Sequence, residues 1–108
     1  MYSRIIMVQQ KCDELGFLVE TRKIPVKEIS YKEVQPVAHE ARAEKYAEMM
    51  RKGVKFKPIM VFGKRHKGDT YEVFDGHARV LAHRILGKKE IEAEITLVDK
   101  KGRPKSCH

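Results

Sequence analysis

The sequence predicts an α+β fold, a small mixed sheet with helices packed on one face. Three observations support this prediction. Residues 38–52 lack proline and glycine and are rich in helix-forming residues. Residues 58–74 contain two short strand-like segments separated by a glycine-bounded turn, and after Gly76 the spacing of apolar residues changes to the helical period. We expect one domain over residues 1–98 and a basic, flexible tail over residues 99–108.

The N-terminal segment has two interpretations. Apolar residues recur at helical spacing from Ile5 to Leu15, and Gly16 could end a helix, so we favour a helix over residues 3–15. The competing interpretation is a strand over residues 4–10, a turn, and a second strand over residues 17–24. In the favoured interpretation the first strand covers residues 17–22. An edge strand then leads through Pro25 to residue 29, since proline is tolerated at a strand edge.

The later elements have clearer signals. In order they are a helix over 38–52 ended by Gly53, a strand over 58–62, a turn over 63–69, a strand over 70–74, a helix after Gly76 ended by Gly87, and a strand over 91–97. The apolar residues expected to be buried are Ala43, Tyr46, Ala47 and Met50 in the first of these helices, Val80, Leu81, Ile85 and Leu86 in the second, and Ile91, Ala93, Ile95 and Leu97 in the last strand.

The chain is strongly basic. It has 23 lysines and arginines against 15 aspartates and glutamates, a formal net charge of +8. Such a surplus attracts polyanions such as nucleotides and nucleic acids, although a solvated surface rich in ion pairs has the same composition. Because the basic residues are spread along the chain, we expect weak, salt-dependent, sequence-independent nucleic-acid binding. No apolar run approaches the roughly 20 residues of a membrane span, so we expect a cytoplasmic protein without membrane contact.

The chain has two cysteines, Cys12 and Cys107, and neither belongs to a C-x-x-C pair. Because Cys107 lies in the polar tail, we do not expect a disulfide. The two thiols and five histidines show no zinc-ligand spacing, so no structural metal is expected.

The segment FDGHARVLAHRILG predicts a strand, a sharp turn and a helix. Asp75 and Gly76 end the strand, and the helix begins at once with His77, Ala78 and Arg79. The first backbone N–H groups of a helix lack intrahelical acceptors and favour an anion. His77 and Arg79 add side-chain donors, and arginine can hold two phosphate oxygens at once. Residues 75–79 are therefore a candidate phosphate-binding turn; the alternative is that Asp75 merely caps the helix.

Residues 23–97 resemble the ParB/sulfiredoxin-like superfamily. The likeness rests on Ile29 after a short strand, a Gly…Pro-Ile-x-Val segment from Gly53 to Val61, the D-G-H-x-R turn, and the Leu-Gly that ends the following helix. It implies that superfamily's fold and nucleotide binding at the turn. Sulfiredoxins carry a reactive cysteine in a G-C-H-R motif, but His77 stands at that position here, so sulfiredoxin chemistry is not expected. ParB proteins bind CTP and carry a further DNA-reading domain, for which we expect no room in this chain.

The turn also resembles that of archaeal free-serine kinases. Those proteins pair a D-G-H-H-R motif with a His-Glu dipeptide at the start of the preceding helix, and His39-Glu40 stands there in this chain. The resemblance implies ATP or ADP as the nucleotide, with CTP not excluded, Mg²⁺ as its charge partner, and a small hydroxyl compound as acceptor. Glu40 would be the general base and His39 a phosphate ligand. Ala78 replaces the second histidine of the kinase motif, and the helix dipole alone can explain an acidic residue at Glu40.

Two functions remain in view. The first is a nucleotide-binding domain that acts as a small phosphotransferase with Glu40 as base. The second is a non-catalytic ParB-like nucleotide- or DNA-binding module that acts through partners.

Overall fold

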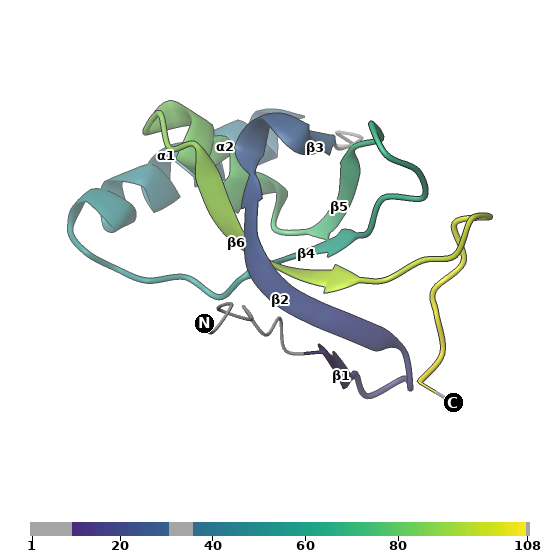
Figure 1. The fold of residues 1–108 in the computed structure, drawn as a ribbon. Coiled ribbons are helices and arrows are strands. Elements are labelled where there is room, and N and C mark those ends of the chain that lie inside the picture. The colour runs from purple at the N-terminus through teal and green to yellow at the C-terminus, as the bar shows by residue number, and fades with distance from the viewer. Residues whose placement is uncertain (1–9, 31–35, 108) are drawn as a thin grey trace, which may run out of the picture.

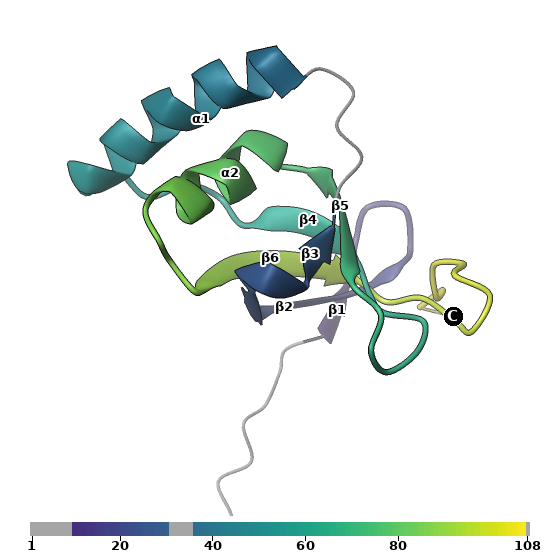
Figure 2. The ribbon, with the colours of Figure 1, turned by 90° about the horizontal axis from the view of Figure 1, so that it is seen from above.

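A computed structural model describes residues 10–30 and 36–107 of the chain. Within them, six strands form one mixed sheet in the order β1-β2-β6-β4-β5-β3, and two α-helices lie over one of its faces (Figure 1, Figure 2). The predicted α+β class is therefore confirmed. The elements are β1 (Gln10–Cys12), β2 (Leu18–Pro25), the 3₁₀ helix η1 (Val26–Glu28), β3 (Ile29–Ser30), α1 (Pro36–Arg51), β4 (Ile59–Phe62), β5 (Tyr71–Asp75), α2 (His77–Ile85) and β6 (Glu90–Thr96).

The centre of the sheet is β6, which pairs with β2 and β4. It runs antiparallel to β2 and parallel to β4, and β4 and β5 form the predicted antiparallel hairpin. The predicted edge strand is shorter than expected, because η1 replaces its middle and only β3 pairs, in parallel, with β5. The alternating side chains Ile91, Ala93 and Ile95 are buried, as their spacing predicted.

The two helices are stacked above the sheet. α2 packs onto β4 and β6, and α1 packs onto α2 as an outer layer (Figure 2). Val80 of α2 belongs to the main core, whereas the buried alanines of the two helices lie outside it: Ala43 and Ala47 of α1, Ala78 and Ala82 of α2. Small side chains on both helices let the two backbones approach closely. Ile85 was predicted to be buried but is 49% exposed, since it is the last residue of α2 and lies beyond Ala82, the last buried residue of that helix.

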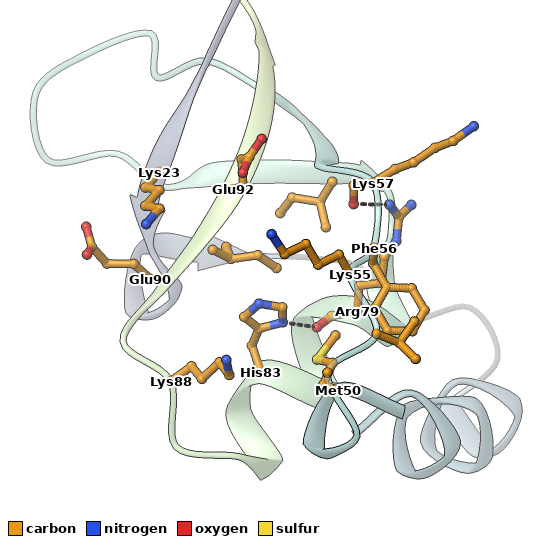
Figure 3. A pocket seen from close by; sticks show the side chains of 14 residues that line it. Lys23, Met50, Lys55, Phe56, Lys57, Arg79, His83, Lys88, Glu90 and Glu92 are labelled. Atoms are coloured by element: carbon orange, nitrogen blue, oxygen red, sulfur yellow. Dashed lines mark hydrogen bonds between the residues drawn. The ribbon is translucent and has the colours of Figure 1, made fainter. Parts of the chain in front are cut away.

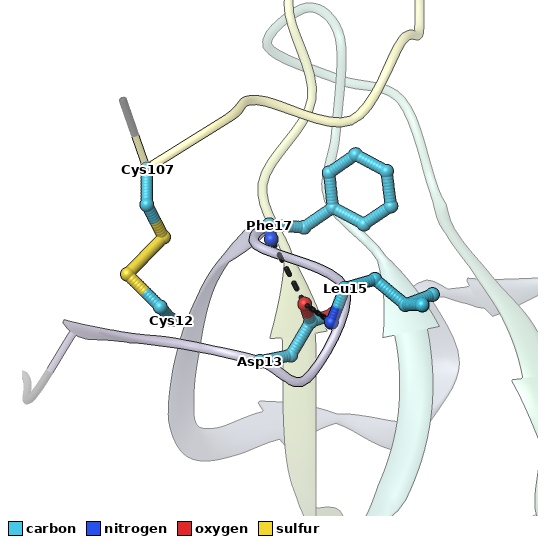
Figure 4. The surroundings of a disulfide bond; sticks show 5 residues. All are labelled: Cys12, Asp13, Leu15, Phe17 and Cys107. Carbon is cyan, nitrogen blue, oxygen red and sulfur yellow. Dashed lines mark hydrogen bonds between the residues drawn. A yellow bond between two sulfur atoms is a disulfide. The ribbon is translucent and has the colours of Figure 1, made fainter.

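The favoured N-terminal helix is wrong where it can be tested. Residues 10–12 form β1, residues 13–16 form a turn, and β2 follows, while residues 3–9 lie outside the described residues. Oδ1 of Asp13 accepts hydrogen bonds from the backbone N–H groups of Leu15 (2.9 Å) and Phe17 (2.8 Å) (Figure 4). An aspartate that bonds its own backbone in this way favours a turn over a helix. The competing strand–turn–strand interpretation has the right order of elements, and its second strand over residues 17–24 matches β2, but β1 covers residues 10–12, where that interpretation placed the end of its first strand and the start of its turn.

A disulfide joins Cys12 to Cys107, contrary to the sequence prediction (Figure 4). The predicted tail does not leave the domain but returns along β2, where the N–H of Leu18 donates to Lys105 O (2.9 Å) and the N–H of Cys107 donates to Gly16 O (2.9 Å). Before this return the chain forms a loop over residues 99–103, in which the backbone N–H groups of Arg103 and Lys101 donate hydrogen bonds to the Asp99 carboxylate. These hydrogen bonds also lower the pKa of Asp99. Residues 99–107 therefore contribute to the folded unit, and this contact brings the two thiols together.

In the described part of the chain, no helix is long and apolar enough to cross a membrane.

Candidate functional site

The turn between β5 and α2 requires glycine for two reasons. Gly76 has φ of 108°, a left-handed conformation that side chains disfavour. A Cβ at this position would also lie 2.6 Å from Cγ2 of Ile59, which is fully buried and has no room to move. Because Gly76 is the residue that caps α2 and has no side chain, no side chain at the cap position satisfies the first backbone N–H groups of the helix.

Asp75 does not cap α2 but pairs with Arg79. Nη2 of Arg79 donates to Oδ2 of Asp75 at 3.0 Å, while Nη1 donates to the backbone carbonyls of Lys57 (2.7 Å) and Pro58 (3.1 Å). The Arg79 side chain is only 15% exposed. In this structure the guanidinium therefore fastens the turn to the chain that leads into β4. A phosphate held by Nη2 would have to share that nitrogen with Asp75.

The start of α1 meets the start of α2 through two histidines. The rings of His39 and His77 are stacked, with their centroids 5.1 Å apart and their planes 4° from parallel. Among the described residues, Nδ1 of His39 is buried without a hydrogen-bond partner. The fold thus brings His39 to the phosphate-binding turn. Glu40 is exposed and lies one residue farther along α1, about 100° around the helix axis.

A cavity beside α2 was not foreseen from the sequence. It encloses about 520 Å³ and is bounded by α2, the end of α1, the chain before β4, and the adjoining parts of β2 and β6 (Figure 3). Nδ1 of His83 lies 2.8 Å from the carbonyl oxygen of Arg79 at its wall. Burial lowers the pKa of His83 below 6.5, and Lys88 lowers it further, whereas the hydrogen bond to Arg79 opposes both. No sequence motif marks this cavity, because its lining residues come from five separate segments.

Among the described residues, no group of three or more histidine, cysteine, aspartate or glutamate side chains is placed to hold a metal ion.

The family model of the ParB N-terminal domain matches residues 10–104. The chain belongs to the ParB N-terminal domain family. No curated protein sequence matches this ParB N-terminal domain.

Solved structures of the same fold include a sulfiredoxin, a ParB and a free serine kinase. Sulfiredoxin from Arabidopsis thaliana is 22% identical, with a TM-score of 0.56 over 75% of this domain and 89% of that chain. A C-terminally truncated ParB from Caulobacter crescentus, complexed with CTP-γ-S, is 22% identical, with a TM-score of 0.52 over 76% and 47% of the two chains. A free serine kinase in complex with AMP is 22% identical, with a TM-score of 0.55 over 86% and 34%. The ParB N-terminal domain described here thus spans most of the sulfiredoxin chain, but less than half of the other two.

The structure also places the two cysteines relative to the turn. They are bonded to each other at the β1 edge of the sheet, whereas the turn follows β5 near the opposite edge. At the position where sulfiredoxins are expected to carry their reactive cysteine, this ParB N-terminal domain has His77, stacked on His39.

Proposed function

We propose that this ParB N-terminal domain binds the phosphates of a nucleotide at the phosphate-binding turn, residues 75–79, with His39 beside it. The observation that supports this most strongly is Gly76, which leaves the start of α2 without a side-chain cap at a position where a Cβ would clash with Ile59. Uncapped helix N-termini attract anions. The stacked His39 and His77 bring further donors to the same place.

The nucleotide we propose is ATP or ADP, with CTP as the competitor to be tested. Two proteins of the same fold have structures with nucleotides, AMP in the free serine kinase and CTP-γ-S in the Caulobacter ParB. Mg²⁺ would enter with the nucleotide, held by its phosphate oxygens. The surplus of 23 basic over 15 acidic residues would raise the concentration of any such anion near the surface.

Substitution of Gly76 tests the binding proposal. We expect Gly76→Ala to weaken nucleotide binding by about tenfold or more, because the new Cβ would displace the backbone N–H groups from the phosphate. Calorimetric titration with ATP, ADP and CTP in the presence of Mg²⁺ measures this loss. Gly87→Ala is the matched control: Gly87 also has positive φ (69°), at the other end of α2, but a Cβ there meets nothing within 4 Å.

The nucleotide affinity of Gly76→Ala is informative only if the variant is folded. If Gly76→Ala has the circular dichroism spectrum of the wild type and binds nucleotide equally well, the phosphate-binding turn is refuted. If Gly76→Ala does not fold, His77→Ala serves in its place, and unchanged affinity in that variant has the same meaning.

We further propose phosphoryl transfer to a small hydroxyl compound, with Glu40 as the base. The supporting observation is the His39–His77 stack, which brings His39 to the phosphate-binding turn, with Glu40 as the next residue of α1. Glu40 would take the proton from the acceptor hydroxyl as the phosphoryl group transfers. Such chemistry depends on positioning and charge stabilisation, so a base, a helix N-terminus and cationic donors form a minimal set.

The catalytic proposal has its own test. We expect Glu40→Gln to slow nucleotide-dependent phosphorylation of free serine by about 10²- to 10⁴-fold, the usual contribution of a general base, without loss of nucleotide binding. Glu44→Gln, an exposed glutamate one turn farther along α1, is the control and should match the wild type. Equal turnover in the wild type and Glu40→Gln, with nucleotide still bound, would leave the non-catalytic module that acts through partners.

A further inference from the structure

The cavity beside α2 exists because β4 begins late. The parallel pairing of β4 with β6 starts at Ile59 and Ala93, so Glu90, Ile91 and Glu92 have no strand partner on that side. The chain before β4 swings away from β6 there, and the cavity of about 520 Å³ fills the gap (Figure 1, Figure 3). This volume lies within the range of small-molecule sites, about 300–1,000 Å³.

The rim of this cavity is cationic. Lysines reach it from three segments: Lys23 from β2, Lys55 from the chain before β4, and Lys88 from the turn after α2, whereas the side chain of Lys57 points away (Figure 3). None of them forms an ion pair with any residue that the structure describes. Two carboxylates, Glu90 and Glu92, also line the cavity, so the lysines are in excess. The Arg79 guanidinium adds no free charge, because it is paired with Asp75.

The cavity also has an apolar wall. Phe56, Ile59 and Ile91 line it together with Met50 and Val54. His83 stands among them (Figure 3). Since a carbonyl oxygen only accepts, Nδ1 of His83 carries the hydrogen that Arg79 O receives, and Nε2 is left as an acceptor in the neutral ring. An apolar wall under a cationic rim suits a compact ring or branched chain that carries an anionic group.

We propose that this cavity is a second binding site, for a small organic anion. The carboxylate or phosphate of the ligand lies between Lys55 and Lys88, and its apolar body packs on Phe56 and Ile91. The site is distinct from the phosphate-binding turn, because Arg79 is the only residue of the turn that lines the cavity, and its guanidinium is bonded to Asp75 and to the carbonyls of Lys57 and Pro58. The proposal therefore does not depend on nucleotide binding at the turn.

The test uses phenyl phosphate and benzoate as probes, which carry the same ring on the two kinds of anionic group. Benzyl alcohol and inorganic phosphate are the controls that lack the anion or the ring. We expect at least one aromatic anion to bind about tenfold or more tightly than either control in calorimetry. The backbone amide NMR shifts should change at residues 53–57 and 88–92 and stay constant at residues 75–77.

Two double variants of equal net charge distinguish specific binding in the cavity from non-specific electrostatic attraction to the basic protein. Lys55→Gln/Lys88→Gln removes two rim cations, whereas Lys67→Gln/Lys101→Gln removes two exposed lysines that do not line the cavity. We expect about a tenfold loss of probe affinity in the first and less than about a twofold change in the second. Equal losses in both variants, or no binding by the wild type, would refute the site. Competition between the probe and ATP would refute it as a separate site.

Discussion

His83 is a half-buried histidine whose titration is tied to the fold. Its pKa lies below 6.5 because burial disfavours the charged ring and Lys88 repels it. In the unfolded chain the same histidine would titrate near 6.5, so between the two pKa values the unfolded state binds more protons. His83 therefore contributes stability above about pH 6.5 that is lost as the pH falls through its folded-state pKa.

We expect the free energy of unfolding of the wild type to decrease more steeply between about pH 7.5 and pH 5 than that of His83→Gln. Glutamine keeps a donor near Arg79 O but has no charge to acquire. Urea unfolding of both proteins across this range measures the difference, and the other histidines, common to both, cancel. A constant difference between the two proteins at all pH values would contradict the assignment.

At the same scale, the sequence revealed only part of the candidate site. Gly76 and His77 could be found because a strand-to-helix junction with glycine is a local pattern, and the structure gives Gly76 the expected conformation. The contacts of Arg79 could not, because the carbonyls of Lys57 and Pro58 reach it from more than 20 residues away. The cavity was hidden for the same reason: pairing between distant segments creates it.

At the scale of elements, prediction succeeded where one local signal was dominant. α1 and α2 were predicted from helix-forming residues followed by glycine. Each helix ends just before its predicted glycine, and Gly53 and Gly87 both have positive φ. β2 overlaps the strand predicted over residues 17–22, whereas β1 was missed because the apolar residues before Gly16 fit both the helical and the extended period. The deciding interaction was the side chain of Asp13, which bonds two backbone N–H groups of the following turn.

The Asp13 turn is therefore testable by substitution. We expect Asp13→Ala to lower the free energy of unfolding by about 1–2 kcal/mol, since two backbone donors lose their acceptor. Glu14→Ala, at an exposed position in the same turn, should change it by less than about 0.5 kcal/mol. Urea unfolding under oxidising conditions measures both. Equal effects would mean that Asp13 does not hold the turn.

At the scale of the whole molecule, the disulfide joins two segments whose contact no local sequence pattern predicts. Cys12 and Cys107 are 95 residues apart and meet only because residues 99–107 return along β2. Closing so long a loop restricts the unfolded chain, an effect of about 3–5 kcal/mol in the chain-entropy model. The bond therefore holds the β1 edge and the C-terminal segment to the domain.

We expect Cys12→Ser/Cys107→Ser to be less stable than the oxidised wild type by up to about 3–5 kcal/mol in urea unfolding. A reductant should destabilise the wild type to a similar extent and leave the double variant unchanged. If the reductant has no effect on the wild type, the disulfide does not contribute to stability.

The same bond makes the folded domain a covalent ring. Both helices and the strands β2 to β6 lie between Cys12 and Cys107, so the loops that connect them belong to the covalently closed part of the chain. A protease that cuts one loop, such as the exposed connection between β4 and β5, opens the ring without releasing a fragment. The cut protein still has both parts of its sheet tethered together, and two cuts are needed before any piece can diffuse away.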